Sequence, residues 1–311
     1  MIMSSFLLSD FGSYYVGGHT HSVTKGEKRT VNFTRNVSYE YDPKGEFSVA
    51  HSYVQYFIPE ERNDLPPVVL VHGGGLTGSV WESTPDGRHG WLHLLLMRGF
   101  EVHVIDMVER GRSGFAPNLF KGQPVSRSLQ EAWSLFRIGA AENFKQRTPF
   151  DNQKFPVDAF DQFTKSLVPR WFENSQYQVD ALVSLLDKLG SSIIICHSQG
   201  GEIGLDAACK IPEAVASIIA IEPSGSPTDL SSLKLKEIPL TLVHGDYLDC
   251  DELWKVQQKV WHDLAAGNQS NRYLIDLPSE LSAGNSHFPM LDNNNEDALD
   301  LILNMSGVLK A

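Results

Sequence analysis

Short apolar runs recur along the chain, and each of them ends in a loop. The clearest runs span residues 68–71, 102–105, 193–195, 218–221, 240–243 and 273–277. Continuous apolar runs of this length are typical of strands buried on both faces of a parallel sheet. Apolar residues at helical spacing separate several of them, most clearly over 179–189, where Gly190 ends the pattern, and again over 253–264 and 298–309. This alternation predicts an α/β fold with a mostly parallel, doubly wound central sheet.

The first sixty residues have a different pattern. Residues 31–41 and 47–58 are rich in β-branched and aromatic side chains, and turn-forming residues, Asp42, Pro43 and Gly45, lie between them. Two such runs joined by a short turn predict antiparallel strands. We therefore expect antiparallel N-terminal strands before the parallel sheet begins.

One interval, residues 115–172, has no clear sheet strand and is rich in aromatic residues. We expect it to form an inserted helical cap, or lid, on a core domain made of residues 1–114 and 173–311. Aromatic side chains of such a cap can line an apolar pocket, and Trp133 and Phe136 are our candidates. The alternative is that these rings pack the small core of the insertion itself, and the two interpretations are compatible.

The sharpest local motif places Ser198 in a tight turn. It reads Cys-His-Ser-Gln-Gly-Gly over residues 196–201, after an apolar strand and before a predicted helix. This matches the G-x-S-x-G nucleophile elbow with Cys196 in place of the first glycine. Ser198 is thus a candidate nucleophile, and the backbone N–H of Gln199 would face a developing oxyanion at the start of the helix.

A glycine-rich loop, His72 to Gly75, follows the strand at 68–71. Glycines leave backbone N–H groups free to point at a ligand, and we expect the Gly74 N–H to supply the other half of an oxyanion hole. A plain glycine turn or a phosphate-binding loop is the alternative. However, the segment matches neither G-x-G-x-x-G nor the P-loop.

A serine nucleophile needs a base and a carboxylate that orients the base. In chain order the base follows the acid, and His287 is the one histidine after the last predicted strand. Two carboxylates compete for the third role. Glu222 follows the strand at 218–221, and Asp246 follows the next one. The pattern alone leaves both open and slightly favours Asp246.

Composition narrows the classes of function. Lys and Arg number 26 against 38 Asp and Glu, which gives a formal net charge of −12. With no basic run, this argues against nucleic-acid binding. No stretch approaches the ~20 apolar residues that span a bilayer, so we expect no membrane association. The start of the chain has no basic region before its apolar residues, so we expect a cytoplasmic protein, with secretion or a periplasmic location left open. Three widely spaced cysteines make neither a disulfide framework nor a zinc motif.

Taken together, these motifs resemble the α/β-hydrolase superfamily. More closely, the chain is similar to the bacterial Ser–His–Glu esterases of the esterase 713 family, almost end to end. The likeness includes Gly-Ser-Tyr-Tyr-Val-Gly-Gly at 12–18, Trp-Glu-Ser-Thr-Pro-Asp-Gly-Arg at 81–88, His-Ser-Gln at 197–199, Glu-Pro at 222–223 and Gly-Asn-Ser-His at 284–287. The string at 81–88 is the most specific of these.

The resemblance implies an α/β-hydrolase fold with an inserted cap, a homodimer, and Glu222 rather than Asp246 as the acid. It implies a serine hydrolase that cleaves a carboxylic ester or lactone through Ser198, His287 and Glu222, with no cofactor and no metal. From the aromatic insertion we expect a bulky apolar small-molecule substrate, open or cyclic. The alternatives are other chemistry on the same fold, such as C–C bond hydrolysis or perhydrolysis, and a non-catalytic ligand-binding module.

Overall fold

The computed structural model describes residues 6–116, 119, 123–226, 237–266 and 271–310. In chain order the strands are β1 (Leu8–Val23), β2 (Arg29–Asn32), β3 (Ser38–Tyr41), β4 (Gly45–Pro59), β5 (Val68–Val71), β6 (Val102–Asp106), β7 (Ser192–His197), β8 (Val215–Ile221), β9 (Leu240–His244) and β10 (Arg272–Asp276). The helices are α1 (Trp91–Met97), α2 (Leu129–Leu135), α3 (Phe160–Thr164), α4 (Ser175–Leu189), α5 (Gln199–Lys210), α6 (Glu252–Ala265), α7 (Leu277–Glu280) and α8 (Asn295–Met305).

Eight strands form one sheet in the order β1-β4-β6-β5-β7-β8-β9-β10. β1 pairs antiparallel with β4 and β4 antiparallel with β6, whereas every other neighbouring pair is parallel. The expected fold class, a mostly parallel sheet preceded by antiparallel strands, is therefore confirmed. All six predicted apolar runs overlap strands. In β5 to β9 nearly all side chains on both faces are buried, whereas the edge strand β10 is only partly buried.

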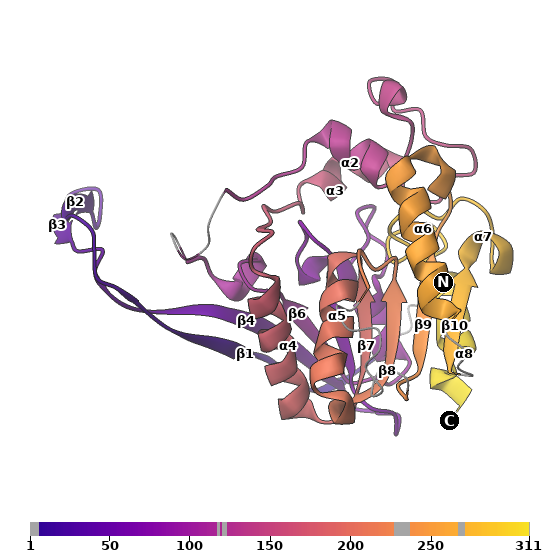
Figure 1. Cartoon of the computed structure of the whole chain (residues 1–311), viewed down its shortest axis with the longest axis horizontal. Coiled ribbons are helices and arrows are strands. Elements are labelled where there is room, and N and C mark those ends of the chain that lie inside the picture. The colour runs from indigo at the N-terminus through magenta and orange to yellow at the C-terminus, as the bar shows by residue number, and fades with distance from the viewer. Residues whose placement is uncertain (1–5, 117–118, 120–122, 227–236, 267–270, 311) are drawn as a thin grey trace.

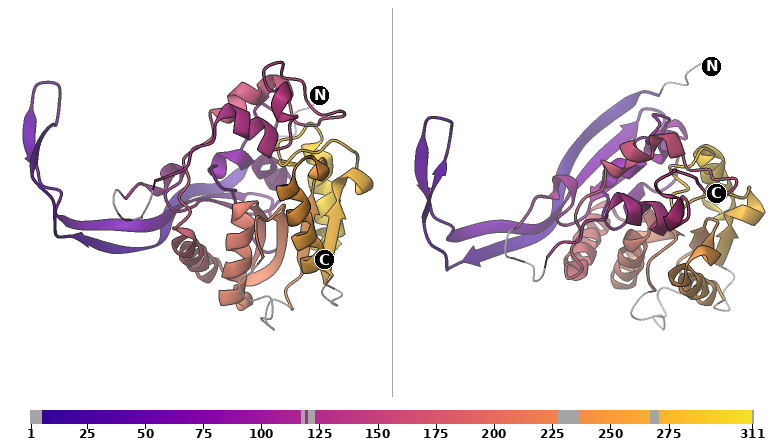
Figure 2. Two further views of the ribbon diagram at one scale, coloured as in Figure 1. Left: turned by 45° about the horizontal axis from the view of Figure 1, so that its top comes forward. Right: turned by 90° about the horizontal axis from the view of Figure 1, so that it is seen from above.

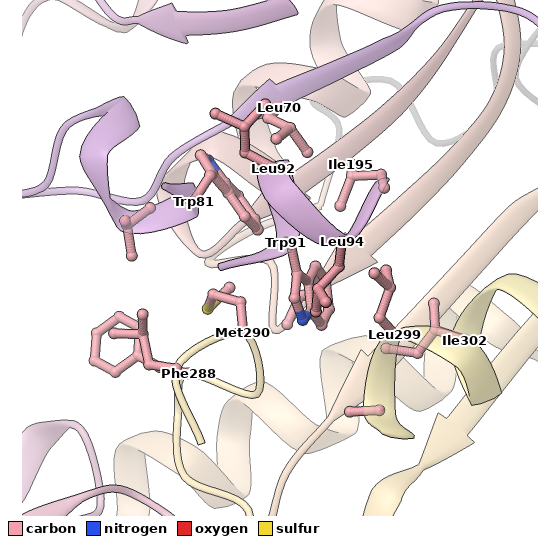
Figure 3. Packing of buried hydrophobic residues seen from close by; sticks show 14 of the residues in the cluster. Leu70, Trp81, Trp91, Leu92, Leu94, Ile195, Phe288, Met290, Leu299 and Ile302 are labelled. Atoms are coloured by element: carbon pink, nitrogen blue, oxygen red, sulfur yellow. The ribbon is translucent and has the colours of Figure 1, made fainter. Parts of the chain in front are cut away.

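Helices cover both faces of the sheet (Figure 1). Residues of β5 alternate between two cores: Val69 and Val71 pack with α4, α5 and α6 on one face, while Val68 and Leu70 pack with α1 and α8 on the other. Figure 3 shows part of the second core, in which Trp91 of α1 lies near Leu299 and Ile302 of α8. The alternation along the strand follows from the two-residue period of side chains in a strand.

The N-terminal region differs from the expected pair of strands. The run expected at 31–41 is divided between two short strands, β2 and β3, which pair with each other as a hairpin. The partner of β4 is instead β1, along almost its whole length. Figures 1 and 2 show β1 and β4 running out of the body as an arm that carries the β2–β3 hairpin at its end. The error arose because a turn at 33–36 interrupts an otherwise strand-like stretch.

Two boundaries also differ from the predictions. The last α-helix ends at Met305 and a 3₁₀ turn follows at Val308–Lys310, so the helix expected over 298–309 is shorter at its C-terminus. Leu277 begins α7 and does not end β10, because Pro278 cannot donate to a sheet ladder and is favoured in the first turn of a helix.

The described residues of the 115–172 interval contribute no strand to the main sheet. They form α2, α3 and two short 3₁₀ helices, and an isolated bridge pairs Val125 with Arg170. In Figure 1 α2 and α3 lie beyond the carboxyl ends of the parallel strands, where β7 and β8 point. Ligands bind at this edge of open α/β sheets, so the interval is positioned to cover a site there.

Candidate active site

Ser198 lies in a strained turn between β7 and α5. Its backbone has φ 51° and ψ −120°, a conformation that non-glycine residues rarely adopt. The backbone N–H of Ser198 donates to Ile221 O at 2.9 Å, and Ser198 O accepts from Gly201 N and Ser224 N. Close packing explains Gly200, two residues further on, since a Cβ at this position would lie 2.4 Å from His72 O. The turn therefore presents a half-buried serine side chain beyond the strand end.

His287 and Glu222 are hydrogen bonded to each other. His287 Nδ1 donates to Glu222 Oε2, and both side chains are almost fully buried. Since an ionised carboxylate only accepts, this contact places the imidazole proton on Nδ1 and leaves a lone pair on Nε2. The His287 ring also stacks on Phe136, with ring centroids 5.6 Å apart and planes inclined by 4°. Ring stacking and the carboxylate together hold the imidazole in one orientation.

Arg137, which the sequence analysis missed, holds the other side of Glu222. Its Nη1 donates to Glu222 Oε2 at 2.9 Å, its Nη2 donates to Oε1, and the side chain is fully buried. Its Nε donates to Asp246 O at 2.7 Å, and its guanidinium lies 4.4 Å from the centre of the Trp254 ring. One signal in the sequence could have found it. Arg137 lies between the apolar residues Phe136 and Ile138, and an arginine that is buried with such neighbours needs a charged partner.

Burial and charge set the protonation states of this pair. Burial alone would raise the pKa of Glu222, but the charges of Arg137 and His287 and the hydrogen bonds from both outweigh it and hold the pKa well below its usual range. Burial lowers the pKa of His287, the Arg137 and Arg127 charges lower it further, and Glu222 opposes the shift. At neutral pH the site therefore holds an ionised Glu222 and a neutral His287.

Asp246 faces the loop that carries His287, not its ring. Asp246 Oδ2 accepts from Gly284 N at 2.8 Å, Oδ1 accepts from Tyr247 N at 2.7 Å, and the backbone N–H of Asp246 donates to Asn285 O. The preference for Asp246 from pattern alone is thus not met, because its carboxylate is engaged by backbone N–H groups. Glu222 occupies the position beside the histidine.

Further hydrogen bonds hold the loop that carries His287 in place. The carboxylate of Asp292 accepts from Ser286 N at 2.8 Å, Ser286 Oγ at 2.7 Å and Asn285 Nδ2 at 2.9 Å. His197 Nε2 donates to His287 O at 2.9 Å. These buried bonds position His287 through its backbone while Glu222 positions its ring.

A cavity of about 200 Å³ joins these groups. Ser198, Glu222, His287, Gly74 and Phe136 all line it. Gln199 lies beside Gly74, because a Cβ added to Gly74 would lie only 2.7 Å from Gln199 Oε1. The structure therefore brings Gly74, Ser198 and His287 to one small space and places the side chain of Gln199 beside Gly74.

Trp133 is not among the residues that line this cavity. Its ring is fully buried, packs edge-on against Phe144 and Phe160, and donates from Nε1 to Ala140 O at 3.1 Å. The expectation that Trp133 lines the pocket is thus not met, because the ring packs among other aromatic rings of the insertion, which join the main core on that face of the sheet. Phe136 does both: it packs on Phe163 and Phe288 and lines the cavity.

Among the residues that the structure describes, no group of three or more His, Cys, Asp or Glu side chains is arranged to hold a metal ion. No helix in the same part of the chain is long and apolar enough to span a membrane.

Comparison with known proteins agrees with this architecture. Residues 66–258 match the model of the α/β-hydrolase fold family. The chain belongs to the α/β-hydrolase family. A solved structure of a bacterial esterase is 30% identical, superposes with a TM-score of 0.85 and matches over 99% of this chain and 98% of its own. The resemblance to bacterial esterases is therefore confirmed.

A curated relative of this hydrolase is a probable secreted lipase, phiG, from Fungal sp. strain ATCC 74256. The two are 30% identical over 185 residues, 57% of this chain. The match spans about half, 50%, of the length of that relative. One relative is an esterase and the other a lipase, so both agree with the expectation of a carboxylic-ester hydrolase.

Proposed function

We propose that this α/β-hydrolase is a serine hydrolase that cleaves carboxylic ester or lactone bonds through an acyl-enzyme. One observation carries the proposal: Ser198, in its strained turn, and His287 line the same cavity, and His287 Nδ1 is hydrogen bonded to Glu222. A nucleophile, a base and an orienting acid in this relation are what acyl transfer requires.

The reaction follows from these roles. Ser198 Oγ attacks the substrate carbonyl carbon while its proton passes to His287 Nε2. The carbonyl oxygen takes the negative charge and accepts from the backbone N–H groups of Gly74 and Gln199. His287 then returns the proton to the leaving alkoxide, and the acyl group stays on Ser198. A water molecule, deprotonated by His287, releases the acid and restores the serine.

The cavity indicates the size of the substrate near the reacting carbonyl. Leu135, Phe136, Leu253 and Trp254 give it apolar walls, and its volume is about 200 Å³. Pockets for drug-sized ligands are typically ~300–1,000 Å³. The expected substrate was bulky and apolar. The size of the cavity indicates that the part of the substrate directly attached to the ester or lactone bond is small and apolar.

The direct test is intact-mass spectrometry after treatment with a fluorophosphonate, which labels activated serines. We expect one adduct per chain on the folded protein, mapped by peptide analysis to Ser198, and none after prior unfolding by urea. A well-folded protein without an adduct would argue for a non-catalytic ligand-binding module instead.

The pH dependence of kcat/KM provides a second test. His287 acts as a base only when neutral, so activity should fall as pH decreases through the pKa of His287. Because burial, Arg137 and Arg127 lower that pKa, we expect the midpoint below 6.5, the ordinary value for histidine. Arg127→Gln should move the midpoint upward. A midpoint above 6.5 in the unmodified protein would contradict this assignment of the base.

Two aromatic substitutions separate the pocket wall from the core of the insertion. Phe136→Ala should change the ratio of kcat/KM for short-chain over long-chain aryl esters, because Phe136 lines the cavity. Trp133→Ala should leave that ratio unchanged but lower the free energy of unfolding by about 3–5 kcal/mol, because it empties a buried site. Each variant is the control for the other. A changed ratio of kcat/KM in Trp133→Ala would contradict the assignment of Phe136 to the pocket wall and Trp133 to the core.

A further inference from the structure

Two arginines that the proposed mechanism does not use line the same cavity as Ser198. Arg127 and Arg170 both belong to the 115–172 interval, Arg170 close to its C-terminal end. An isolated antiparallel bridge joins Val125 to Arg170, with Val125 N donating to Arg170 O at 2.8 Å and Arg170 N donating to Val125 O at 2.9 Å. This backbone pairing brings the two guanidinium groups to one wall of the cavity.

The arginine wall lies next to the oxyanion loop. Val168 N donates to Gly75 O at 2.8 Å, which ties the segment before Arg170 to that loop. A Cβ added to Gly74 would lie 2.8 Å from Arg170 Nη1. A group bound by Arg170 would therefore sit close to the carbonyl that Ser198 attacks.

Both guanidinium groups have unused donors. The Nε atoms of Arg127 and Arg170 are inaccessible to solvent and have no hydrogen-bond partner in the described structure. Arg127 Nη1 donates to Glu131, and the side chain of Arg127 is only 17% exposed. Buried donors without partners are costly, so both side chains keep hydrogen-bonding capacity that the described protein atoms leave unsatisfied.

Three arginines interact electrostatically at this wall. Burial lowers the pKa of Arg170, the charge of Arg127 lowers it further, and Glu202 opposes the shift. Arg110 is also buried, and its Nη2 has no hydrogen-bond partner among the described residues. Burial and the charge of Arg170 lower its pKa, and Glu109 opposes the shift. Glu131, Glu202 and Glu109 each offset one of these charges. An anion would therefore be held here by the directed N–H donors of Arg127 and Arg170 rather than by an excess of positive charge.

We propose that Arg127 and Arg170 bind a carboxylate of the substrate, so that the preferred substrates are esters or lactones carrying a second, free carboxylate. This inference rests on the proposed function, which supplies the reacting ester. The planar guanidinium donors fit the two oxygens of a carboxylate better than any apolar group. The apolar walls then hold the short chain between that carboxylate and the scissile bond.

The test compares isosteric esters. Mono-(4-nitrophenyl) glutarate carries a carboxylate on the acyl side, and 4-nitrophenyl 5-methylhexanoate replaces it with an isopropyl group. A second pair, 4-acetoxybenzoate and 4-isopropylphenyl acetate, carries the same difference on the alcohol side. In at least one pair we expect kcat/KM to be at least about tenfold higher for the anionic ester, because charge-assisted hydrogen bonds to its carboxylate contribute a free energy of that size. That preference should shrink as salt is raised.

Three variants locate the preference. Arg127→Gln and Arg170→Gln should each reduce the anionic-to-neutral ratio by about tenfold, while Arg170→Lys should restore part of it. Arg62→Gln is the matched control, because Arg62 pairs with Glu101 outside the cavity at 2.8 Å, and it should leave the ratio unchanged. Equal losses on both members of a pair would overturn the proposal and assign Arg170 to the oxyanion instead.

A binding measurement separates this proposal from the proposed function. Calorimetric titration of Ser198→Ala with each ester of a pair reports recognition without turnover. Tighter binding of the anionic ester, lost in the added Arg170→Gln change, supports the carboxylate site even where no ester is turned over. Equal binding of both esters, or none, overturns it, whereas fluorophosphonate labelling decides the hydrolase function independently.

Discussion

Ser198→Ala is expected to lower kcat for an aryl ester by about 10⁵- to 10⁶-fold, the loss typical of removing a serine nucleophile. Residual activity would come from the oxyanion donors and from binding alone. The free energy of unfolding should stay nearly constant, because the Ser198 side chain is half-buried and its backbone bonds to Ile221, Gly201 and Ser224 do not involve the hydroxyl. Kinetics with 4-nitrophenyl esters and urea unfolding of the same preparations measure both quantities.

A second variant at this position tests the strain of the turn. Ser198→Gly removes the same nucleophile but tolerates φ 51° without steric cost. We expect the same loss of kcat together with a gain of about 1–3 kcal/mol in the free energy of unfolding, less the extra entropy of the unfolded glycine chain. If glycine destabilised the protein relative to alanine, the turn would not be strained.

Glu222→Gln is expected to cost both activity and stability. The amide no longer holds the Nδ1 proton of His287 as a carboxylate does, and comparable substitutions lower kcat by about 10⁴-fold. Arg137 would also lose the charge that compensates its own, since both of its terminal nitrogens bond to Glu222. Leaving such a charge buried and unpaired typically costs about 3–5 kcal/mol. Ester kinetics and urea unfolding report the two effects separately.

Two companion variants sharpen this result. Asp246→Asn is the control for the competing acid, and its effect on kcat should be smaller by orders of magnitude, because Asp246 bonds to backbone N–H groups. The double variant Glu222→Gln/Arg137→Met removes both charges and should regain part of the lost stability without regaining activity. A larger loss of activity in Asp246→Asn than in Glu222→Gln would reverse the assignment of the acid.

Local patterns were sufficient for most of the sheet. The strands at 68–71 and 240–243 were predicted within one residue, because strands buried on both faces form short, mostly apolar runs that end where polar loop residues begin. Residues 31–41 were harder to interpret. Their composition favours strand throughout, but a hairpin turn at 33–36 depends on local backbone geometry that residue type alone does not specify.

The sequence by itself determined the fold class, the turn that carries Ser198 and the loop that carries His287, since each depends on residues adjacent in the chain. Residue patterns left the two carboxylates open, the resemblance to bacterial esterases favoured Glu222, and the tertiary structure shows Glu222 beside His287. Glu222 and Asp246 both follow neighbouring strands, and what distinguishes them is which one faces His287 and the guanidinium of Arg137, 85 residues from Glu222. The same holds for Trp133 and Phe136, because packing between distant segments determines which aromatic ring faces a cavity and which one fills a core.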